Sequence, residues 1–191
     1  MSSEIEQRGR ARGRAALAGF ATAVALLALP AGSAMATGGI STGGGSGTVA
    51  GDTAKLRANG QAVPPENAPR RVKRAIRAGN DIVGKPYFYG GGHNSGFRDS
   101  RGYDCSGAVS YVLSDRYGAR VLDAPMPSSG FMGGWGRRGR GEWITTYASS
   151  GHMYVMVAGL RFESHTYGDG PSWSKQNATR SGYAVRHPRG L

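Results

Sequence analysis

The chain has 191 residues, a formal net charge of +12 and a single cysteine. One cysteine excludes an internal disulfide, and it also excludes a zinc site built from several thiolates. A surface this basic favours anionic partners, although the same charge also serves solubility alone.

The first 36 residues are typical of a secretion signal rather than of a folded element. A basic start with four arginines precedes an apolar run from Ala15 to Pro30, and Ala34–Ala36 is a small-x-small cleavage site. The apolar run is short for a membrane span, which needs about 20 residues. We therefore predict that residues 1–36 are removed, that the protein acts in the cell wall or medium, and that no membrane span remains.

The next segment, residues 37–66, is rich in glycine, serine and threonine. It offers too little apolar surface to order itself, so a disordered linker is predicted. Residues 67–191 have the length of one domain. This domain is predicted to open with a helix from its N-cap Asn67 to about Ile82, whose arginine-rich face is solvated.

The cysteine lies at the start of a second predicted helix, from Cys105 to Tyr117. Asp104 is its predicted N-cap, and Gly118 closes its C-terminus. The sulfur then lies in the first helical turn, where the positive end of the helix dipole favours a thiolate. The alternative is a buried cysteine that serves only as a small apolar side chain.

Strand patterns dominate the C-terminal half, after a glycine- and proline-rich stretch at 119–143 that is predicted to be a loop. Four strands are predicted, over 143–148, 152–157, 160–165 and, at a sheet edge after a polar loop, 183–187. Ala158-Gly159 is the predicted turn of a hairpin that pairs Val157 with Leu160 and Met156 with Arg161. A helix that carries the thiol and packs on a small antiparallel sheet is an α+β arrangement.

A cysteine nucleophile needs a base, and the base needs an orienting partner. His152 begins the hairpin that is expected to pack on the cysteine helix, so its imidazole can approach Cys105. The hairpin register places His165 beside His152 and Glu163 diagonal to it, so either side chain can orient the base. For each histidine, the alternative is a strand residue without catalytic function. The histidine spacing is not that of a zinc site, so no metal and no cofactor are predicted.

Three blocks of the sequence resemble the hallmark motifs of the NlpC-type peptidoglycan cysteine peptidases. They are Lys85-Pro86-Tyr87-Phe88-Tyr89-Gly90-Gly91, Asp104-Cys105-Ser106-Gly107 and Gly151-His152-Met153-Tyr154-Val155-Met156. Their order and separations also match, and the resemblance covers residues 67 to 187. One departure is Gly141-Glu142-Trp143, which stands where relatives usually carry a Gly-Asp-Leu turn.

The resemblance implies a papain-like α+β fold that hydrolyses peptide bonds of the peptidoglycan stem, usually between D-glutamate and the following diamino acid. The implied catalytic residues are Cys105, His152 and either His165 or Glu163, and the implied substrate-binding residues are Tyr87, Asp104 and Ser106. The implied partners are stem peptides, with anionic wall polymers attracted by the basic surface.

Other function classes stay open at this point. One is a catalytically silent module that binds the cell wall through its positive charge. Another is an amidase or acyltransferase that uses the same cysteine and histidine on a different bond. An extracellular nucleic-acid binder is the third, and it would bind oligonucleotides even without Cys105. We predict the peptidase, with no nucleic acid as partner.

Overall fold

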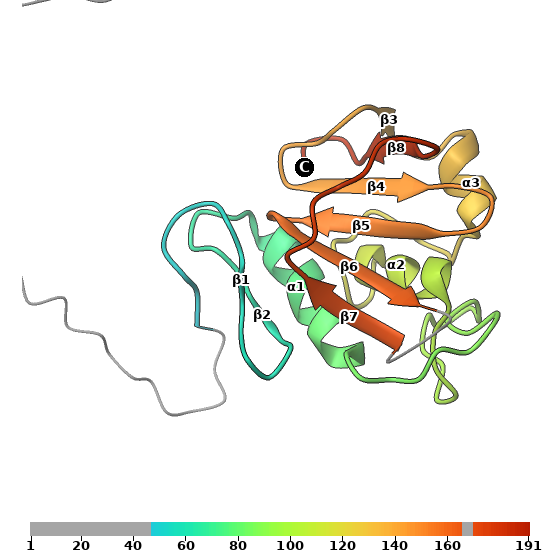
Figure 1. Ribbon diagram of the computed structural model, residues 1–191, viewed down its shortest axis with the longest axis horizontal. Coiled ribbons are helices and arrows are strands. Elements are labelled where there is room, and N and C mark those ends of the chain that lie inside the picture. The colour runs from blue at the N-terminus through green and yellow to red at the C-terminus, as the bar shows by residue number, and fades with distance from the viewer. Residues whose placement is uncertain (1–46, 166–169) are drawn as a thin grey trace, which may run out of the picture. The chain divides into compact units, whose positions relative to one another are not determined.

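The computed structural model describes residues 47–165 and 170–191 (Figure 1). The predicted secretion signal and the first part of the predicted linker, residues 37–46, lie outside the described residues. None of the helices in the described part of the chain is long and apolar enough to span a membrane.

A six-stranded antiparallel sheet with the strand order β3-β8-β4-β5-β6-β7 forms the centre of the domain. Its strands are β3 (Arg137–Arg138), β4 (Ile144–Ala148), β5 (Met153–Val157), β6 (Leu160–His165), β7 (Gly170–Ser174) and β8 (Ala184–His187). The predicted hairpin is confirmed, because Val157 pairs with Leu160 and Met156 with Arg161. Its turn residues Ala158 and Gly159 have φ angles of 47° and 85°, as a two-residue type I′ turn requires.

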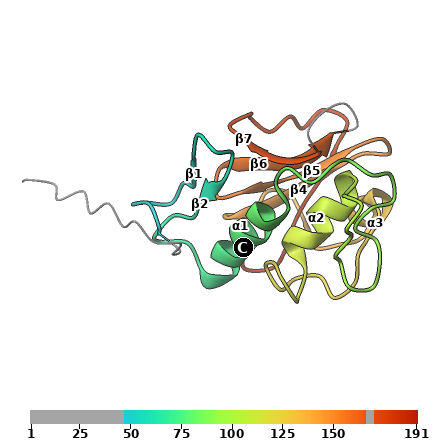
Figure 2. The same cartoon turned by 90° about the horizontal axis from the view of Figure 1, so that it is seen from below.

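Two helices, α1 (Arg70–Ile82) and α2 (Cys105–Leu113), cover one face of this sheet (Figure 2). The short helix α3 (Ser128–Gly133) contacts β4 and β8. The α+β class is therefore confirmed, with the cysteine helix packed on a small antiparallel sheet as in the predicted papain-like arrangement.

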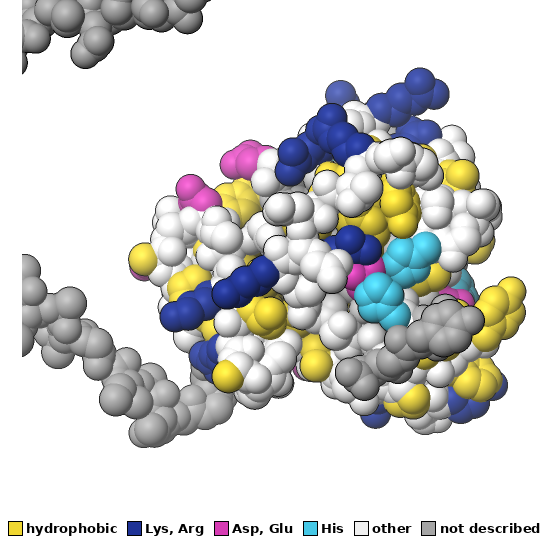
Figure 3. All heavy atoms as spheres, viewed as in Figure 1, with side chains coloured by type: hydrophobic (Ala, Val, Ile, Leu, Met, Phe, Trp, Pro, Cys, Tyr) yellow, Lys and Arg dark blue, Asp and Glu magenta, His cyan; other side chains and the backbone are white. Residues whose placement is uncertain are grey.

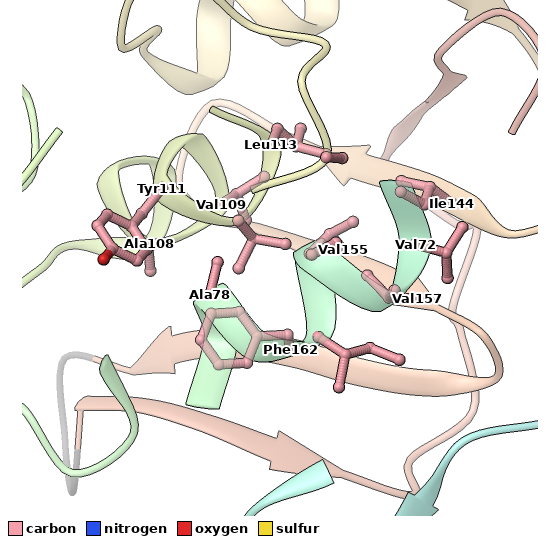
Figure 4. Close-up of a cluster of buried hydrophobic side chains, with 14 of the residues drawn as sticks. Val72, Ala78, Ala108, Val109, Tyr111, Leu113, Ile144, Val155, Val157 and Phe162 are labelled. Carbon is pink, nitrogen blue, oxygen red and sulfur yellow. The ribbon is translucent and has the colours of Figure 1, made fainter. Parts of the chain in front are cut away.

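The core lies between these helices and the sheet (Figure 4). Apolar residues recur every three or four positions on the helices and alternate along the strands, so one face of each element is apolar. Fully buried members include Val72, Ala78, Val109, Leu113, Val155 and Phe162. Each large apolar side chain contributes about 1.5 to 3 kcal/mol through burial, which makes this layer a rigid support for the start of α2.

Both helix boundaries differ from the prediction. Helix α1 begins after Pro69 without a side-chain cap, and the predicted cap Asn67 instead donates its amide to Asp52 Oδ1 at 2.9 Å. Helix α2 ends at Leu113 rather than Tyr117. It ends early because the Ser114 hydroxyl oxygen accepts backbone N–H groups of the following turn at 3.1 Å, which replaces the next helical hydrogen bonds.

The basic face of α1 is not simply solvated. Arg71 and Arg74 each donate two hydrogen bonds, at 2.8 to 3.0 Å, to backbone carbonyls of the loop 116–120. The planar guanidinium fork suits this paired geometry. These two arginines therefore fix the loop that leaves α2.

Part of the predicted disordered linker is ordered. The strands β1 (Lys55–Leu56) and β2 (Ala62–Val63) form a small antiparallel pair. This pair is attached to the domain, because Ala54 N donates to Ala158 O at 2.8 Å and the Asn80 side chain exchanges two hydrogen bonds of 2.8 Å with the backbone of β2. Ala54 and Ala62 are also buried members of the hydrophobic core, and Leu56 packs against it. The segment is therefore ordered by tertiary hydrogen bonds together with a few buried apolar side chains, so the prediction is wrong for residues 47–66.

Three further elements lie in segments that were predicted to be loops. Helix α3 and strand β3 fall within 119–143, and β7 falls within the predicted polar loop before the last strand. The Trp173 ring of β7 lies 4.6 Å from the Phe162 ring, and this contact is invisible in the local sequence pattern. The predicted edge strand β8 is present, but it lies inside the sheet between β3 and β4.

Candidate active site

Cys105 is the first residue of α2 and is partly buried. The predicted N-cap is confirmed, because Asp104 Oδ1 accepts the backbone N–H of Gly107 at 2.7 Å. The other carboxylate oxygen of Asp104 accepts the N–H of Gly90 at 3.0 Å. One carboxylate therefore both starts the helix and ties the glycine loop to it.

Close backbone contacts explain why glycines surround the cysteine. A Cβ atom at Gly107 would lie 1.9 Å from the carbonyl oxygen of Gly91, and one at Gly91 would lie 2.4 Å from that of Gly102. No side chain fits at such distances, so the start of α2 rests directly on the loop. Gly91 and Gly107, which belong to the motif blocks, are thus also required for this close packing.

His152 lies directly before β5, in a turn where Ser149 Oγ accepts its N–H at 3.1 Å. Its ring Nε2 lies 2.8 Å from Glu163 Oε2, and 26% of the side chain is exposed. A hydrogen bond with Cys105, and next the hydrogen bond with Glu163, raise the pKa of His152 to about 9 against the opposing effect of burial. The imidazolium form is therefore favoured at neutral pH, beside the sulfur.

Glu163 and His165, the two alternatives for the orienting residue, have different positions. Glu163 is only 2% exposed and contacts His152 directly, whereas the His165 side chain is 48% exposed and its Nε2 lies 3.0 Å from Glu163 Oε1. The rings of His152 and His165 stack with centroids 5.5 Å apart. Figure 3 shows histidine side chains gathered at the surface over β5 and β6, next to acidic and basic side chains. The geometry thus favours Glu163 as the group that orients His152.

The Glu163 carboxylate remains ionised in spite of its burial. Burial raises its pKa, but hydrogen bonds from His152 and Arg161 and the nearby positive charges lower it more, so the net pKa falls below the usual value. Arg161, which sequence analysis did not assign to the site, lies 2.6 Å from Glu163 Oε2. The two-residue period of a strand would have found it, because Arg161, Glu163 and His165 alternate onto one face.

A second histidine–carboxylate pair, on the loop before α2, lies next to Cys105. His93 Nε2 lies 3.1 Å from Asp104 Oδ1 and 3.0 Å from Ser106 Oγ. Burial raises the pKa of Asp104, but hydrogen bonds from His93 and Gly107 lower it more, so its net pKa is low. No spacing pattern in the sequence indicated His93.

The predicted substrate-binding residues Asp104 and Ser106 therefore face His93. The third, Tyr87, is half-buried, and its backbone forms a bridge to Tyr103. Tyr103 O also accepts a hydrogen bond of 2.9 Å from Ser164 Oγ, which joins β6 to the segment that leads into α2.

The histidines and the carboxylate on the sheet could also serve as metal ligands. One donor atom from each of His152, Glu163 and His165 lies within 4.8 Å of the others, and two histidines with one glutamate are a ligand set that zinc accepts. Sequence spacing missed this cluster because its ligands come from two strands. The Arg161 guanidinium on Glu163 and a protonated His152 both oppose a divalent cation.

Comparisons with known proteins give distant similarities. No family model and no curated protein matches the sequence. Among solved structures, the chain is similar to the peptidoglycan hydrolase RipB from Mycobacterium tuberculosis, with a TM-score of 0.45 and 22% identity over 63% of this chain and 68% of that one. It is also similar to a mutated form of the resuscitation promoting factor interacting protein RipA, with a TM-score of 0.43 and 23% identity over 63% of this chain and 65% of that one. At these values neither similarity assigns an activity to this chain.

Proposed function

We propose that this protein is a cysteine endopeptidase of the NlpC type, which hydrolyses peptide bonds in peptidoglycan stem peptides outside the plasma membrane. The observation that carries the proposal is that His152 Nε2 lies 2.8 Å from the buried carboxylate of Glu163, while interaction with Cys105 is the first cause of the raised pKa of His152. A nucleophile, a base and an orienting group in one connected chain are the minimum set for thiol-based acyl transfer. The three sequence blocks that resemble the family provide these residues.

In the first half-reaction, the Cys105 thiolate attacks the scissile carbonyl carbon and forms a tetrahedral intermediate. The backbone N–H of Cys105, at the free N-terminus of α2, is positioned to donate to the oxyanion. The His152 imidazolium then gives its proton to the leaving amine, the C–N bond breaks, and an acyl-enzyme remains.

In the second half-reaction, neutral His152 takes a proton from water while the oxygen attacks the thioester. The carboxylate product leaves, and the thiolate–imidazolium pair is restored. Glu163 stabilises the charged imidazole in both halves and fixes which nitrogen faces the sulfur.

The substrate side of the proposal concerns the loop cluster. Tyr87, Asp104 and Ser106 bind the stem peptide, and the bond after D-glutamate is the proposed cleavage point. Asp104 carries a full negative charge beside the nucleophile, so it favours a positively charged or hydrogen-bond-donating part of the peptide. Anionic wall polymers are the proposed partners of the basic surface.

Digestion of purified sacculi tests the proposal. Wild-type protein is expected to release muropeptides, and mass spectrometry is expected to show new amine and carboxyl termini within the stem. Cys105→Ala is expected to release none, whereas His187→Asn, at a histidine on β8 away from this cluster, serves as the matched control. Binding without release by the wild type would favour the silent wall-binding module, and cleavage between glycan and peptide would favour an amidase.

A further inference from the structure

Arg161 is a largely buried arginine that the proposed reaction does not use. It lies on β6, two residues before Glu163, and only 12% of its side chain is exposed. Its terminal nitrogen Nη2 lies 2.6 Å from Glu163 Oε2. The same oxygen lies 2.8 Å from His152 Nε2. One carboxylate oxygen thus receives both the arginine and the base.

Aromatic stacking holds Arg161 in this position. Its guanidinium carbon lies 3.8 Å from the centroid of the Tyr154 ring, and Tyr154 in turn stacks on Tyr147 at 4.8 Å and 6°. The Tyr154 hydroxyl donates to Thr179 O at 2.7 Å and accepts from Thr179 N at 2.9 Å. Each contact restricts the next, so the guanidinium has little freedom to leave Glu163.

The buried position of Arg161 is less favourable than that of an ion pair that serves stability alone. The Nε atom of Arg161 is buried and has no hydrogen-bond partner among the described residues. A buried donor without a partner is unfavourable, because it has given up its hydrogen bond with water. The ion pair also lies beside the His152 imidazolium, so Arg161 competes with it for one carboxylate. An arginine with such unfavourable burial beside the proposed base is better explained by an effect on that base than by a contribution to stability.

The surroundings of Glu163 define what Arg161 controls. In the described part of the chain, the titratable side chains around it are His152, Arg161, His165 and, under the guanidinium, Tyr154. Strand β7 places the uncharged Ser172 opposite Glu163. Arg161 is the permanently charged member of this set, so it keeps its charge across the pH range in which His152 titrates.

We propose that Arg161 is a positioning residue for the base: it holds Glu163 Oε2 in line with His152 and adds a permanent positive charge next to the Cys105–His152 pair. The inference rests on the proposed thiol chemistry but not on the identity of the substrate. Without the arginine, the pair loses a nearby positive charge that favours its thiolate member, so the ion pair is expected to be lost at a higher pH on its acidic side.

Alkylation of Cys105 by iodoacetamide measures this effect without any substrate. The rate is followed against pH for the wild type, Arg161→Met, Arg161→Gln and Arg161→Lys, with Arg138→Met, at an exposed arginine on β3, as the matched control. We expect the acidic limb of the rate profile to move upward by about one pH unit in Arg161→Met and Arg161→Gln. Arg161→Lys, which keeps the charge, is expected to restore most of the shift, and Arg138→Met is expected to match the wild type.

A folded Arg161→Met or Arg161→Gln protein whose profile overlays that of the wild type would overturn the proposal. If the methionine variant does not fold, the glutamine variant decides, because it removes the charge and retains a hydrogen-bond donor. Digestion of sacculi separates this inference from the proposed function: a wild type inactive on sacculi with a shifted alkylation profile in the variants would sink the peptidase and leave the positioning residue. On an active substrate, the variants are expected to lower kcat about tenfold with KM unchanged.

Discussion

Two histidine–carboxylate pairs flank Cys105, and they differ in what else the carboxylate holds. On the sheet, the Glu163 carboxylate contacts the side chains of His152, His165 and Arg161 and no backbone N–H group among the described residues. On the loop, Asp104 accepts the backbone N–H groups of Gly90 and Gly107 in addition to its contact with His93. The Glu163 carboxylate can therefore balance the positive charge of an imidazole, whereas the Asp104 carboxylate is part of the helix cap. In this protein, His152 is therefore the better candidate for the base, because its carboxylate partner does not cap a helix.

The most severe test of this contrast removes the proposed base. His152→Ala is expected to lower kcat by about 10² to 10⁴, because His152 is the proposed donor of the proton to the leaving amine. The measurement is the initial rate of muropeptide release from sacculi. A loss of comparable size in His187→Ala, on β8, would contradict the assignment.

Glu163→Gln tests the orienting carboxylate and gives a pH signature. The pKa of His152, about 9, is raised by Cys105 first and by Glu163 second, so activity that needs the imidazolium is lost as the pH rises through about 9. Without the negative charge, this basic limb is expected to move to lower pH, with a fall in kcat of about 10- to 100-fold. The pH dependence of kcat is the measurement, and a basic limb that stays in place would exclude Glu163 as the partner.

Gly107→Ala tests whether the glycine contact positions the nucleophile. The added methyl group would lie 1.9 Å from the carbonyl oxygen of Gly91, so the start of α2 must move. We expect a loss of about 1 to 3 kcal/mol in the free energy of unfolding, together with reduced activity. Urea unfolding is the measurement, and Gly133→Ala, where the new atom meets nothing within 4 Å, is the control. Equal stability of the two variants would show that the loop yields without cost.

His93→Asn is expected to have the smallest effect. If His93, Asp104 and Ser106 bind substrate and do not transfer protons, the variant raises KM less than tenfold and leaves the alkylation rate of Cys105 unchanged. Steady-state kinetics and iodoacetamide labelling check the two halves of this expectation. A changed alkylation profile would make His93 a second influence on the thiol.

Sequence reasoning predicted those features that depend on a local pattern. The hairpin turn, the pairing of Met156 with Arg161 and the capping by Asp104 follow from turn and cap chemistry, and all three are confirmed. The approach of His152 to Cys105 follows from chain order combined with packing of a helix on a sheet. The choice between Glu163 and His165 required coordinates, because a register places both near His152 without saying which ring nitrogen faces which oxygen.

The features that were missed depend on contacts between distant segments. Residues 47–66 are held by hydrogen bonds between β2 and the Asn80 side chain of α1 and between Ala54 and the turn at Ala158, and β7 is positioned by Trp173 against Phe162. The early end of α2 depends on one hydroxyl, that of Ser114, which can either face solvent or accept the next N–H groups. Composition cannot distinguish these outcomes, because tertiary contacts override weak local preferences.

Strand β6 joins the two halves of the candidate site through neighbouring residues. Glu163 holds the imidazole on one face, and Ser164 on the other face bonds to Tyr103 O, two residues before the thiol. Local opening of this single strand would release the proposed nucleophile and the proposed base together. Heat inactivation is therefore expected to coincide with the loss of amide-exchange protection in β6, even while the rest of the sheet stays closed.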